Sequence, residues 1–478
     1  MKMIIGDLPV DALDRTTITI TNPATGEAID TVPDAGPDDV ALAVAKAKAG
    51  QKAWAKVPVH QRAAILRRFL SLVDERREAL ARTLSAETGK PIREARAEIG
   101  NIFIGFEAFI EKAKHLYGDV IPNGSEPGQE STLQLTLREP IGVVACIIPF
   151  NFPCDLFDQK VAPTLMAGNA AIVKPPHQNP LTLIKLTELM LEAGVRGGAI
   201  QVITGQGAKA GAALTAHPDV HKISFTGSTA VGIETAKNAA SHLAHISLEL
   251  GGNDAFIVHE DADLDLAVEE MIWGRMYNAG QVCCASKRFL VHNRVRAAFV
   301  DKAAARMKTL KVGVPDKEDT QIACLVTEAA ARQVEAQVAR TVEQGGRLVL
   351  GGERTGAFFA PTLIDAIPKT ADVARDLEIF GPVVSVIGFD TLDEAIEIAN
   401  ASKFGLAGCI FSADMKTAMK TAAALECGSV VINGASFYRS FEMPFGGYKY
   451  SGLGTEGVLS TFAEVTRLKT VVLKNVLA

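Results

Sequence analysis

Two kinds of hydrophobic pattern alternate along most of the chain: short, wholly apolar runs and longer runs with helical spacing. The segment 37–54 is of the second kind, because apolar residues recur there at intervals of three and four behind a helix-starting proline, which predicts an amphipathic helix. The residues at this spacing are Val40, Ala43, Val44 and Ala47. A second helix is predicted over residues 61–86, and the glycine and proline of TGKP at 88–91 indicate a turn or loop soon after it.

From residue 141 onward, apolar strands and helices follow each other regularly. The strands read IGVVACII, NAAIVK, AIQVIT, KISFTGS, ISLEL and DAFIV, and helices are predicted over 181–194, ending on Gly194, and over 230–240. The second half repeats this texture with KRFLVH, VVSVIGF, AGCIFS and GSVVING, and with helices near 295–309 and 329–345. Nearly continuous apolar strands separated by helices indicate parallel sheets covered on both faces, so the pattern predicts an α/β fold.

The segment 118–139 has a different pattern. Its Pro, Gly and Ser residues give way to the alternation TLQLTLR, which predicts an exposed hairpin rather than a core strand. The last stretch, EVTRLKTVVLKN, alternates weakly and is compatible with a terminal strand or an edge pairing. An exposed hairpin leaves an unpaired strand edge, which a second chain could cover.

Length and composition narrow the class of protein. A chain of 478 residues is too long for one core, and 48% apolar with 22% charged residues is ordinary for a globular protein. The net charge of −6 gives no sign of the excess of basic residues that binding to nucleic acid or to anionic lipid requires. The opening MKMIIGDLPV lacks the apolar core of a signal peptide, and no apolar run reaches the roughly 18 residues of a membrane span.

The cysteines favour a reducing compartment, and we expect a cytoplasmic protein. There are seven, an odd number, and apart from one adjacent pair they stand singly, so a disulfide framework is not expected. Neither a CxxC pair nor an HExxH motif occurs, and we expect no metal site.

Three polar features follow apolar strands. In KISFTGSTAVG a strand runs into Gly227 and Ser228 and then a helix, which is the arrangement of an anion site, although a simple tight turn would look the same. Glu249 ends the strand in LELGG; such a carboxylate is either solvated or, in a cleft, a general base. Asn151, among prolines and phenylalanines in PFNFP, is either a turn cap or a rigidly held donor of the kind an oxyanion hole needs.

The letters GQVCCA place two thiols side by side. Cysteine in apolar surroundings is usually a small buried hydrophobe, and Cys284 fits that description. Cys283 has small or polar neighbours, so an accessible nucleophilic thiolate is plausible there.

Taken in order, these features resemble the NAD(P)-dependent aldehyde dehydrogenase superfamily, over nearly the whole chain. The motifs that carry the resemblance are NPATGE, PFNFP, GNAAIVKP, FTGST, LELGG, GQVCCA, EIFGPV and PFGGYKYSGLG, of which GQVCCA and LELGG are the most specific.

The resemblance implies an architecture of two doubly wound Rossmann-like domains, one for the cofactor and one for catalysis, plus a small β oligomerisation element. The cofactor domain would comprise 1–117 and 140–250, with the hairpin 118–139 between them. The catalytic domain would span 251–440, and 441–478 would return to the cofactor domain and supply the oligomerisation strand. A homodimer or homotetramer that binds a small aldehyde and NAD or NADP is implied.

The resemblance also implies roles for individual residues. Cys283 corresponds to the nucleophile with Cys284 packed beside it, Asn151 to the oxyanion donor, and Glu249 to the general base. The implied cofactor-binding residues are Lys174, His177, Gly205, Phe225, Gly227, Ser228, Glu378 and Phe380, and the implied substrate-pocket residues are Asp155, Tyr277, Val282 and Phe437.

The implied reaction follows from these roles. The thiolate adds to the aldehyde, the oxyanion donor stabilises the alkoxide, and hydride transfer to the nicotinamide leaves a thioester. The general base then activates water, and hydrolysis releases a carboxylic acid.

The sequence departs from the family pattern in places that bear on specificity. His177 stands where many NAD-preferring members have a glutamate that would repel the 2′-phosphate, so we expect NADP to be tolerated. Gln159 and Tyr277 replace two arginines of the succinate-semialdehyde type, and Val282 replaces an arginine of the glyceraldehyde-phosphate type, which argues against those substrates. We expect an uncharged, semi-polar or aromatic aldehyde.

Two arginines could supply charge near the pocket, Arg275 and Arg439, but a surface or structural salt bridge is the expected role of each. Two alternatives to the main interpretation stay open. In a CoA-acylating enzyme CoA would take the thioester in place of water. In the second alternative the chain is a cofactor-binding protein that has kept the fold and lost the catalytic activity.

Overall fold

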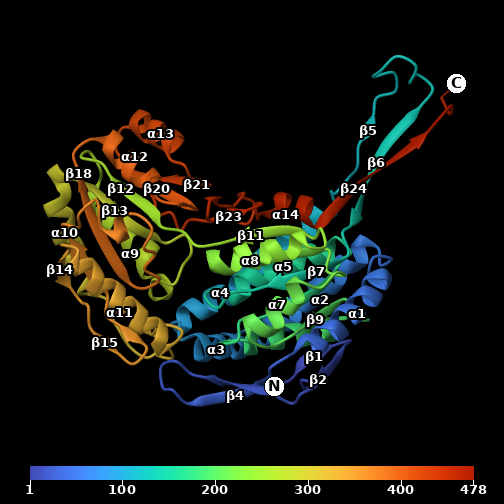
Figure 1. Ribbon diagram of the computed structural model, residues 1–478, viewed down its shortest axis with the longest axis horizontal. Coiled ribbons are helices and arrows are strands. Elements are labelled where there is room, and N and C mark those ends of the chain that lie inside the picture. Colours follow the sequence, from blue (N-terminus) through green and yellow to red (C-terminus); the bar gives the residue numbers. More distant parts are fainter. Residues whose placement is uncertain (478) are drawn as a thin grey trace.

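Two large, mostly parallel sheets dominate the computed structural model, which describes residues 1–477 (Figure 1). The first sheet belongs to a unit built from both ends of the chain, and the second to a unit built from residues 254–432. A narrow three-stranded arm projects from the first unit, and the C-terminal end of the chain lies along it (Figure 1).

The first sheet has eight strands in the order β2-β1-β9-β8-β7-β10-β11-β23. Its five central strands, β9 to β11 in that order, are parallel, while β1, β2 and β23 join antiparallel at the edges. The strands are β1 (Met3–Ile5), β2 (Leu8–Val10), β7 (Val143–Ile147), β8 (Ala170–Lys174), β9 (Ile200–Val202), β10 (Lys222–Thr226), β11 (His245–Glu249) and β23 (Gly452–Leu453).

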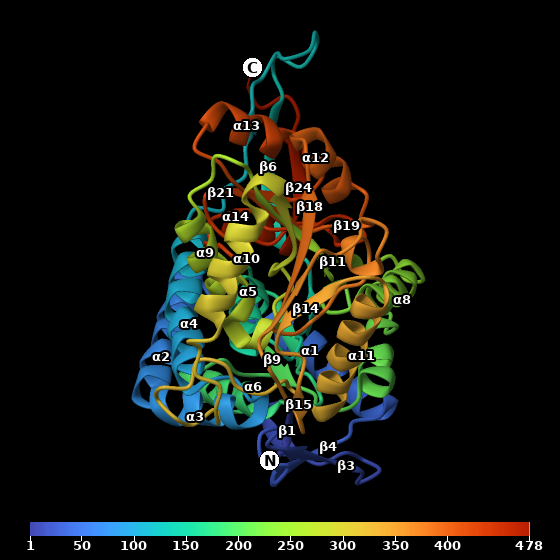
Figure 2. The same ribbon diagram turned by 90° about the vertical axis from the view of Figure 1, so that its left-hand side faces the viewer.

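Helices cover both faces of this sheet, because its strands are apolar on both sides. In β7, Val144 and Cys146 enter one core and Val143 and Ala145 enter the other. The first core is closed by α2 (Val59–Glu75), α3 (Arg77–Thr88), α4 (Ile92–Ala113), α5 (Pro153–Met166), α6 (Leu181–Ala193) and α14 (Val458–Val465), and the second by α1 (Pro37–Trp54), α7 (Ala212–Thr215) and α8 (Thr229–Ala240). Figure 2 shows α2 and α4 on one side of the molecule and α8 on the other.

The second sheet has seven strands in the order β14-β17-β18-β13-β12-β20-β21, parallel except for β14. The strands are β12 (Asp254–Val258), β13 (Ser286–His292), β14 (Arg347–Leu350), β17 (Thr362–Asp365), β18 (Val383–Phe389), β20 (Ala407–Phe411) and β21 (Ser429–Ile432). The helices of this unit are α9 (Leu264–Met276), α10 (Asn293–Met307), α11 (Glu328–Glu343), α12 (Leu392–Asn400) and α13 (Met415–Ala424), and they enclose a separate hydrophobic core.

The arm consists of β5 (Val120–Ile121), β6 (Leu133–Pro140) and β24 (Thr466–Leu473). β24 pairs with β6 in an antiparallel register over its whole length, so the predicted terminal strand forms. Leu137, Leu468 and Val472 are exposed on the arm. Three small pairs complete the strands: β3 (Thr17–Thr21) with β4 (Ala28–Pro33), β15 (Arg354–Thr355) with β16 (Phe358–Phe359), and β19 (Phe404–Gly405) with β22 (Tyr448–Lys449).

The predicted fold class, two doubly wound α/β units with a small β element, is confirmed, whereas one predicted helix is wrong. Residues 61–86 form two helices rather than one, because the backbone leaves the helical region at Arg76, with φ −114° and ψ 13°. The hairpin of β3 and β4 was not predicted, and the boundaries of the domains stay a prediction. Within residues 1–477 no helix is both long and apolar enough to cross a membrane.

Candidate active site

The order in which the chain adds strands to the first sheet reverses between β7 and β10. From β7 the chain adds β8 and β9 on one side and then returns to place β10 and β11 on the other. In such sheets ligands bind at this switch point, outside the carboxyl ends of the strands. Asn151 follows β7 closely, Gly227 follows β10, and Glu249 ends β11. The backbone N–H of Gly227 donates to the carbonyl of Glu249 at 3.0 Å, which holds two of these three ends together.

The loop that carries Cys283 comes from the second unit and approaches from the amino end of β13. It begins with a one-turn 3₁₀ segment, Tyr277–Gly280, in which Asn278 and Ala279 have φ of 49° and 50°. Left-handed conformations at non-glycine residues are costly and are typical of sites where the surroundings fix the backbone.

Arg275 helps to fix the backbone of this loop. Its guanidinium is 1% exposed and donates to the carbonyl oxygens of Val383 at 2.6 Å and Ile379 at 2.8 Å. The expectation of a salt bridge for Arg275 is therefore wrong: this arginine saturates backbone acceptors that burial would leave unpaired.

Asn151 is tied to the same loop. Its side-chain Nδ2 donates to the carbonyl of Gln281 at 3.0 Å, two residues before Cys283. Its own carbonyl accepts from Asn278 Nδ2 at 2.9 Å and from Lys90 Nζ at 2.8 Å. Asn151 is 6% exposed, so an amide donor is held rigidly against the nucleophile loop, as an oxyanion hole requires.

The segment after Glu249 also runs against this loop. A Cβ added at Gly252 would lie 2.9 Å from the carbonyl oxygen of Cys283, so only glycine permits this approach. The sequence LELGG therefore brings the end of β11 to the nucleophile loop, and the two candidate motifs meet although they come from different units.

The two adjacent thiols have different environments. Cys283 is partly exposed and Cys284 is 4% exposed. The pKa of Cys283 is lowered to about 7, because a hydrogen bond from Cys284 and the charges of Lys287 and Arg439 together outweigh the opposing effect of burial. The hydrogen bond with Cys283, together with burial, raises the pKa of Cys284. The pKa values of Cys146, Cys154, Cys324, Cys409 and Cys427 are all raised by burial.

Glu249 is 4% exposed, and neither of its carboxylate oxygens has a hydrogen-bond partner among residues 1–477. Burial raises its pKa well above the usual range, and the charge of Glu456 adds to the effect. A carboxyl group with free oxygens and a raised pKa binds a proton more readily than an ordinary carboxylate, which suits a general base.

A buried ion-pair triad lies behind these groups. Glu456 accepts from Lys160 Nζ at 2.6 Å with one oxygen and from Arg439 Nη2 at 3.0 Å with the other. The expected salt bridge of Arg439 is thus present. Glu456 comes from the C-terminal segment, which therefore contributes to the site.

The candidate cofactor residues lie along the carboxyl edge of the first sheet. Lys174, at the end of β8, is 4% exposed and donates to the carbonyls of Gly205 at 2.6 Å and Pro175 at 2.9 Å. Burial lowers its pKa to about 8. Gly205 has φ of 139°, and a Cβ there would lie 3.0 Å from the backbone of Ala35. His177 is exposed three residues after Lys174.

The turn after β10 fits a phosphate group. Ser228 is the N-cap of α8, and its side chain accepts from the N–H of Val231 at 3.5 Å. A Cβ on Gly227 would lie 2.6 Å from the ring of Phe225, so glycine keeps the backbone close to that ring. The free N–H groups at the start of a helix of this length favour an anion.

Lys287 lies between Cys283 on one side and Glu378 and Phe380 on the other. Glu378 accepts from the N–H of Gly252 at 3.3 Å and pairs with Lys287 at 3.2 Å. Lys287 Nζ also donates to the carbonyl of Cys283 at 2.5 Å, and it lies 5.8 Å from the ring centroid of Phe380. Sequence reasoning missed Lys287, although its position four residues after Cys283 was a visible signal.

The candidate substrate residues gather around an aromatic cluster. The ring of Phe437 lies 5.2 Å from that of Tyr277, 6.2 Å from Phe152 and 4.9 Å from Trp273. Val282 is buried in a small apolar cluster that Phe437, Phe152 and Cys283 also contact. Sequence reasoning missed Phe152 and Trp273 as part of this wall.

Asp155 faces the neighbouring helix α4 on the same side. Its Oδ2 accepts from Asn101 Nδ2 at 3.3 Å, and its Oδ1 has no partner among residues 1–477. Burial raises its pKa to about 8, so this carboxyl group is largely neutral at pH 7.

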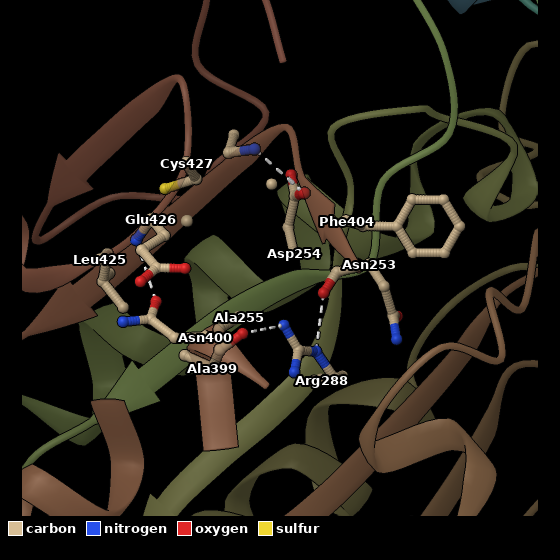
Figure 3. Close-up of a pocket in the computed structure, with 13 residues that line it drawn as sticks. Asn253, Asp254, Ala255, Arg288, Ala399, Asn400, Phe404, Leu425, Glu426 and Cys427 are labelled. Carbon is tan, nitrogen blue, oxygen red and sulfur yellow. Dashed lines mark hydrogen bonds between the residues drawn. The ribbon is translucent and has the colours of Figure 1, made fainter. Parts of the chain in front are cut away.

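A small cavity lies beside Asn253 and Asp254, the two residues that follow the LELGG segment (Figure 3). Asn253, Asp254, Arg288 and Cys427 are among its lining residues, and its volume is about 20 Å³. Asp254 points into this region and accepts from the N–H of Ala407 at 3.1 Å. A cavity of this size has room for a water molecule and not for an aldehyde or a cofactor.

Comparison with known proteins agrees with this geometry. The model of the aldehyde dehydrogenase family matches residues 10–471. The chain is 39% identical over 478 residues to a 3-sulfolactaldehyde dehydrogenase of Pseudomonas putida, covering 99% of this chain and 97% of that protein. It is 38% identical over 451 residues to the NADP(+) succinate-semialdehyde dehydrogenase GabD of Escherichia coli, covering 94% of this chain and 92% of that protein.

A solved structure shows the same likeness. A betaine aldehyde dehydrogenase from Staphylococcus aureus, solved in complex with NAD+, superimposes with a TM-score of 0.95 at 33% identity. The match covers 99% of this chain and 97% of that chain.

Proposed function

Because the chain belongs to the aldehyde dehydrogenase family and oxidises an aldehyde with NAD or NADP, we propose that Cys283, Asn151 and Glu249 carry out its chemistry. The observation that supports this most directly is the meeting of three segments at one place. The amide of Asn151 donates to the loop of Cys283, and Gly252, three residues after Glu249, lies so close to this loop that a Cβ on it would come within 2.9 Å of the carbonyl oxygen of Cys283.

In this proposal Cys283 adds to the carbonyl carbon of the aldehyde as a thiolate. A pKa near 7 keeps a large fraction of the thiol ionised at neutral pH, while the sulfur remains a good nucleophile. Asn151 Nδ2 donates to the alkoxide that forms, and its rigid anchoring removes the cost of orienting it during the reaction.

The cofactor, when bound, supplies the hydride acceptor that converts the hemithioacetal on Cys283 into a thioester. Glu249 then removes a proton from water, which attacks the thioester and releases the acid and the free thiol. The raised pKa of Glu249 suits this exchange of protons, and its free oxygens leave it able to bind the water.

The proposed cofactor residues fit an adenine dinucleotide at both ends. The helix start at Ser228 would hold the pyrophosphate, and Lys174 would lie by the adenosine ribose. Glu378, beside Lys287, would bind the nicotinamide ribose close to Cys283, with Phe380 alongside. His177 places no carboxylate at the adenosine ribose, and we propose that both NAD and NADP are accepted.

Hydrolysis, rather than transfer to CoA, is supported by Glu249. A thiol acceptor needs no base to activate water, whereas this site holds a buried carboxyl group with free oxygens. Product analysis with and without CoA tests the choice: we expect free acid in both cases, and acyl-CoA without free acid would reverse it.

The arm supports a homodimer or homotetramer. Its sheet has only three strands, and apolar side chains such as Leu468 and Val472 are exposed on it. A second copy would cover this surface and the free strand edge. The seven cysteines are all unpaired, which supports a reducing compartment such as the cytoplasm.

Replacement of Cys283 tests the core of the proposal. Cys283→Ala is expected to lower turnover of any accepted aldehyde by at least about a thousandfold, because the proposed covalent intermediate forms on this sulfur. Undiminished turnover by this variant, with NAD or NADP, would overturn the proposed function.

A further inference from the structure

Arg439 lies in the chain segment between β21 and β22, which also carries Phe437 and Phe445. The centre of its guanidinium stands 4.0 Å from the ring centroid of Phe445. Phe445 belongs to the apolar cluster that Cys283 and Phe437 contact. This arginine is therefore at the wall of the aldehyde site and not on the outer surface.

The charge of Arg439 is only partly balanced. Glu456 faces two cations, Lys160 on one oxygen and Arg439 on the other, so the triad carries a net positive charge. A guanidinium has five N–H donors, and the bond to Glu456 is the one hydrogen bond that Arg439 makes within residues 1–477. Its Nε has no partner there, and the side chain is 22% exposed.

The neighbouring carboxyl groups oppose this charge less than ordinary carboxylates would. Burial raises the pKa of Asp155 to about 8, so that group is largely neutral at pH 7, and burial also raises the pKa values of Asp158 and Glu249 above the usual range. Lys90 and Glu98 pair with each other, both 1% exposed, and compensate one another. Arg439 therefore brings a partly balanced positive charge, together with N–H donors that have no partner within residues 1–477, to the wall that holds Cys283.

We propose that Arg439 is the specificity-determining residue of this enzyme and binds a carboxylate or sulfonate at the far end of the aldehyde. A planar guanidinium held at one nitrogen presents its remaining N–H groups as a fork, which matches an anionic oxygen pair. The substrate class is then an aldehyde with a second, acidic group. This differs from the uncharged aldehyde expected from the sequence, because positions 159 and 277 lack arginine while position 439 supplies one.

The inference rests on the proposed function, and a matched set of aldehydes tests the two separately. The probes are glutarate semialdehyde, pentanal and trimethylammonio-pentanal, which share a chain length and differ in charge at the far end. We expect the highest kcat/KM for glutarate semialdehyde. Oxidation of none of these probes, by wild-type enzyme with NAD or NADP, would count against the proposed function. Equal use of the acidic and neutral probes, or preference for the cationic one, would overturn the role of Arg439.

Variants of Arg439 give the second test. Arg439→Gln is expected to lower the ratio of kcat/KM for glutarate semialdehyde to that for pentanal by about 10- to 100-fold, the cost of one or two charge-assisted hydrogen bonds. The ratio cancels any loss common to both aldehydes. Arg439→Lys should keep part of the selectivity. Arg294→Gln, an exposed arginine paired with Glu260, is the matched control and should leave the ratio unchanged.

A measurement on the wild-type enzyme covers the case in which Arg439→Gln does not fold. Glutarate should inhibit aldehyde oxidation at lower concentration than pentanoate, because only the dicarboxylate offers an anion to both Arg439 and the catalytic end. Equal inhibition by the two acids would overturn the proposal.

Discussion

Lys287 and Glu378 form an ion pair of 3.2 Å in which the lysine also donates to the backbone carbonyl of Cys283. The lysine side chain is 1% exposed and the glutamate 22%. One ammonium group thus connects the nucleophile loop to the carboxylate proposed to bind the nicotinamide ribose. Under the proposed function, the position of Cys283 and the binding of the nicotinamide ribose would both depend on Lys287.

Replacement of Lys287 by methionine should therefore affect both functions. We expect kcat/KM to fall about 10- to 100-fold, a higher KM for NAD, and a higher apparent pKa for Cys283, because a nearby positive charge is lost. Steady-state kinetics over a range of pH measures all three. A fall in kcat with the pH profile and the KM for NAD unchanged would contradict this account.

The pKa of Cys283 predicts the pH dependence of its reactivity. Alkylation of the enzyme by iodoacetamide should accelerate as pH rises through about 7, because the thiolate is the reactive form. Cys284→Ala removes the hydrogen bond that stabilises the thiolate, so the midpoint should move to higher pH. A midpoint that stays in place in Cys284→Ala would show that the neighbouring thiol does not tune the nucleophile.

If Glu249 is the general base, its replacement should separate formation of the thioester from its hydrolysis. Glu249→Gln is expected to lower steady-state turnover by about 10²- to 10⁴-fold and to leave a burst of reduced cofactor, because the thioester forms but hydrolyses slowly. Stopped-flow absorbance measures the burst. In the wild type, the hydrolysis rate should rise with pH through the raised pKa of Glu249, since only the ionised form accepts a proton. A Glu249→Gln variant without a burst would place this residue before the thioester instead.

Cofactor preference should respond to position 177. His177→Glu places a carboxylate three residues after Lys174, where it would repel the 2′-phosphate of NADP. We expect kcat/KM for NADP to fall at least about tenfold relative to that for NAD. His177→Gln is the neutral control and should keep the wild-type ratio. Strict use of NAD by the wild type would refute the expectation that both are accepted.

The buried guanidinium of Arg275 predicts an effect on stability. Arg275→Met leaves the carbonyl oxygens of Val383 and Ile379 buried and unpaired, which should cost about 2–4 kcal/mol of the free energy of unfolding. Denaturant unfolding of the purified variant measures the change. Lys302→Met removes an exposed pair with Asp265 and should cost less than about 1 kcal/mol.

The sequence was informative where a local pattern determines the structure. Short sequence patterns predict the apolar strands, the turn at Gly227 and the strand end at Glu249. These patterns occur along the chain in the order that the family resemblance implies. The break at Arg76 was invisible because neither proline nor glycine marks it. The roles of Lys287, Trp273 and Arg439 depend on contacts between residues far apart in the chain, such as Arg439 with Glu456 and Lys160, and no local pattern encodes those.

The order in which the strands occur has a consequence for synthesis on the ribosome. The second unit uses one continuous segment, 254–432, and its sheet can assemble once that segment has emerged. The first unit takes β23 and α14 from residues 452–465, so it stays open along one edge until nearly the whole chain has been translated. A prematurely ended chain would thus contain a finished second unit attached to an unfinished first one, with Glu456 and its two cations never brought together.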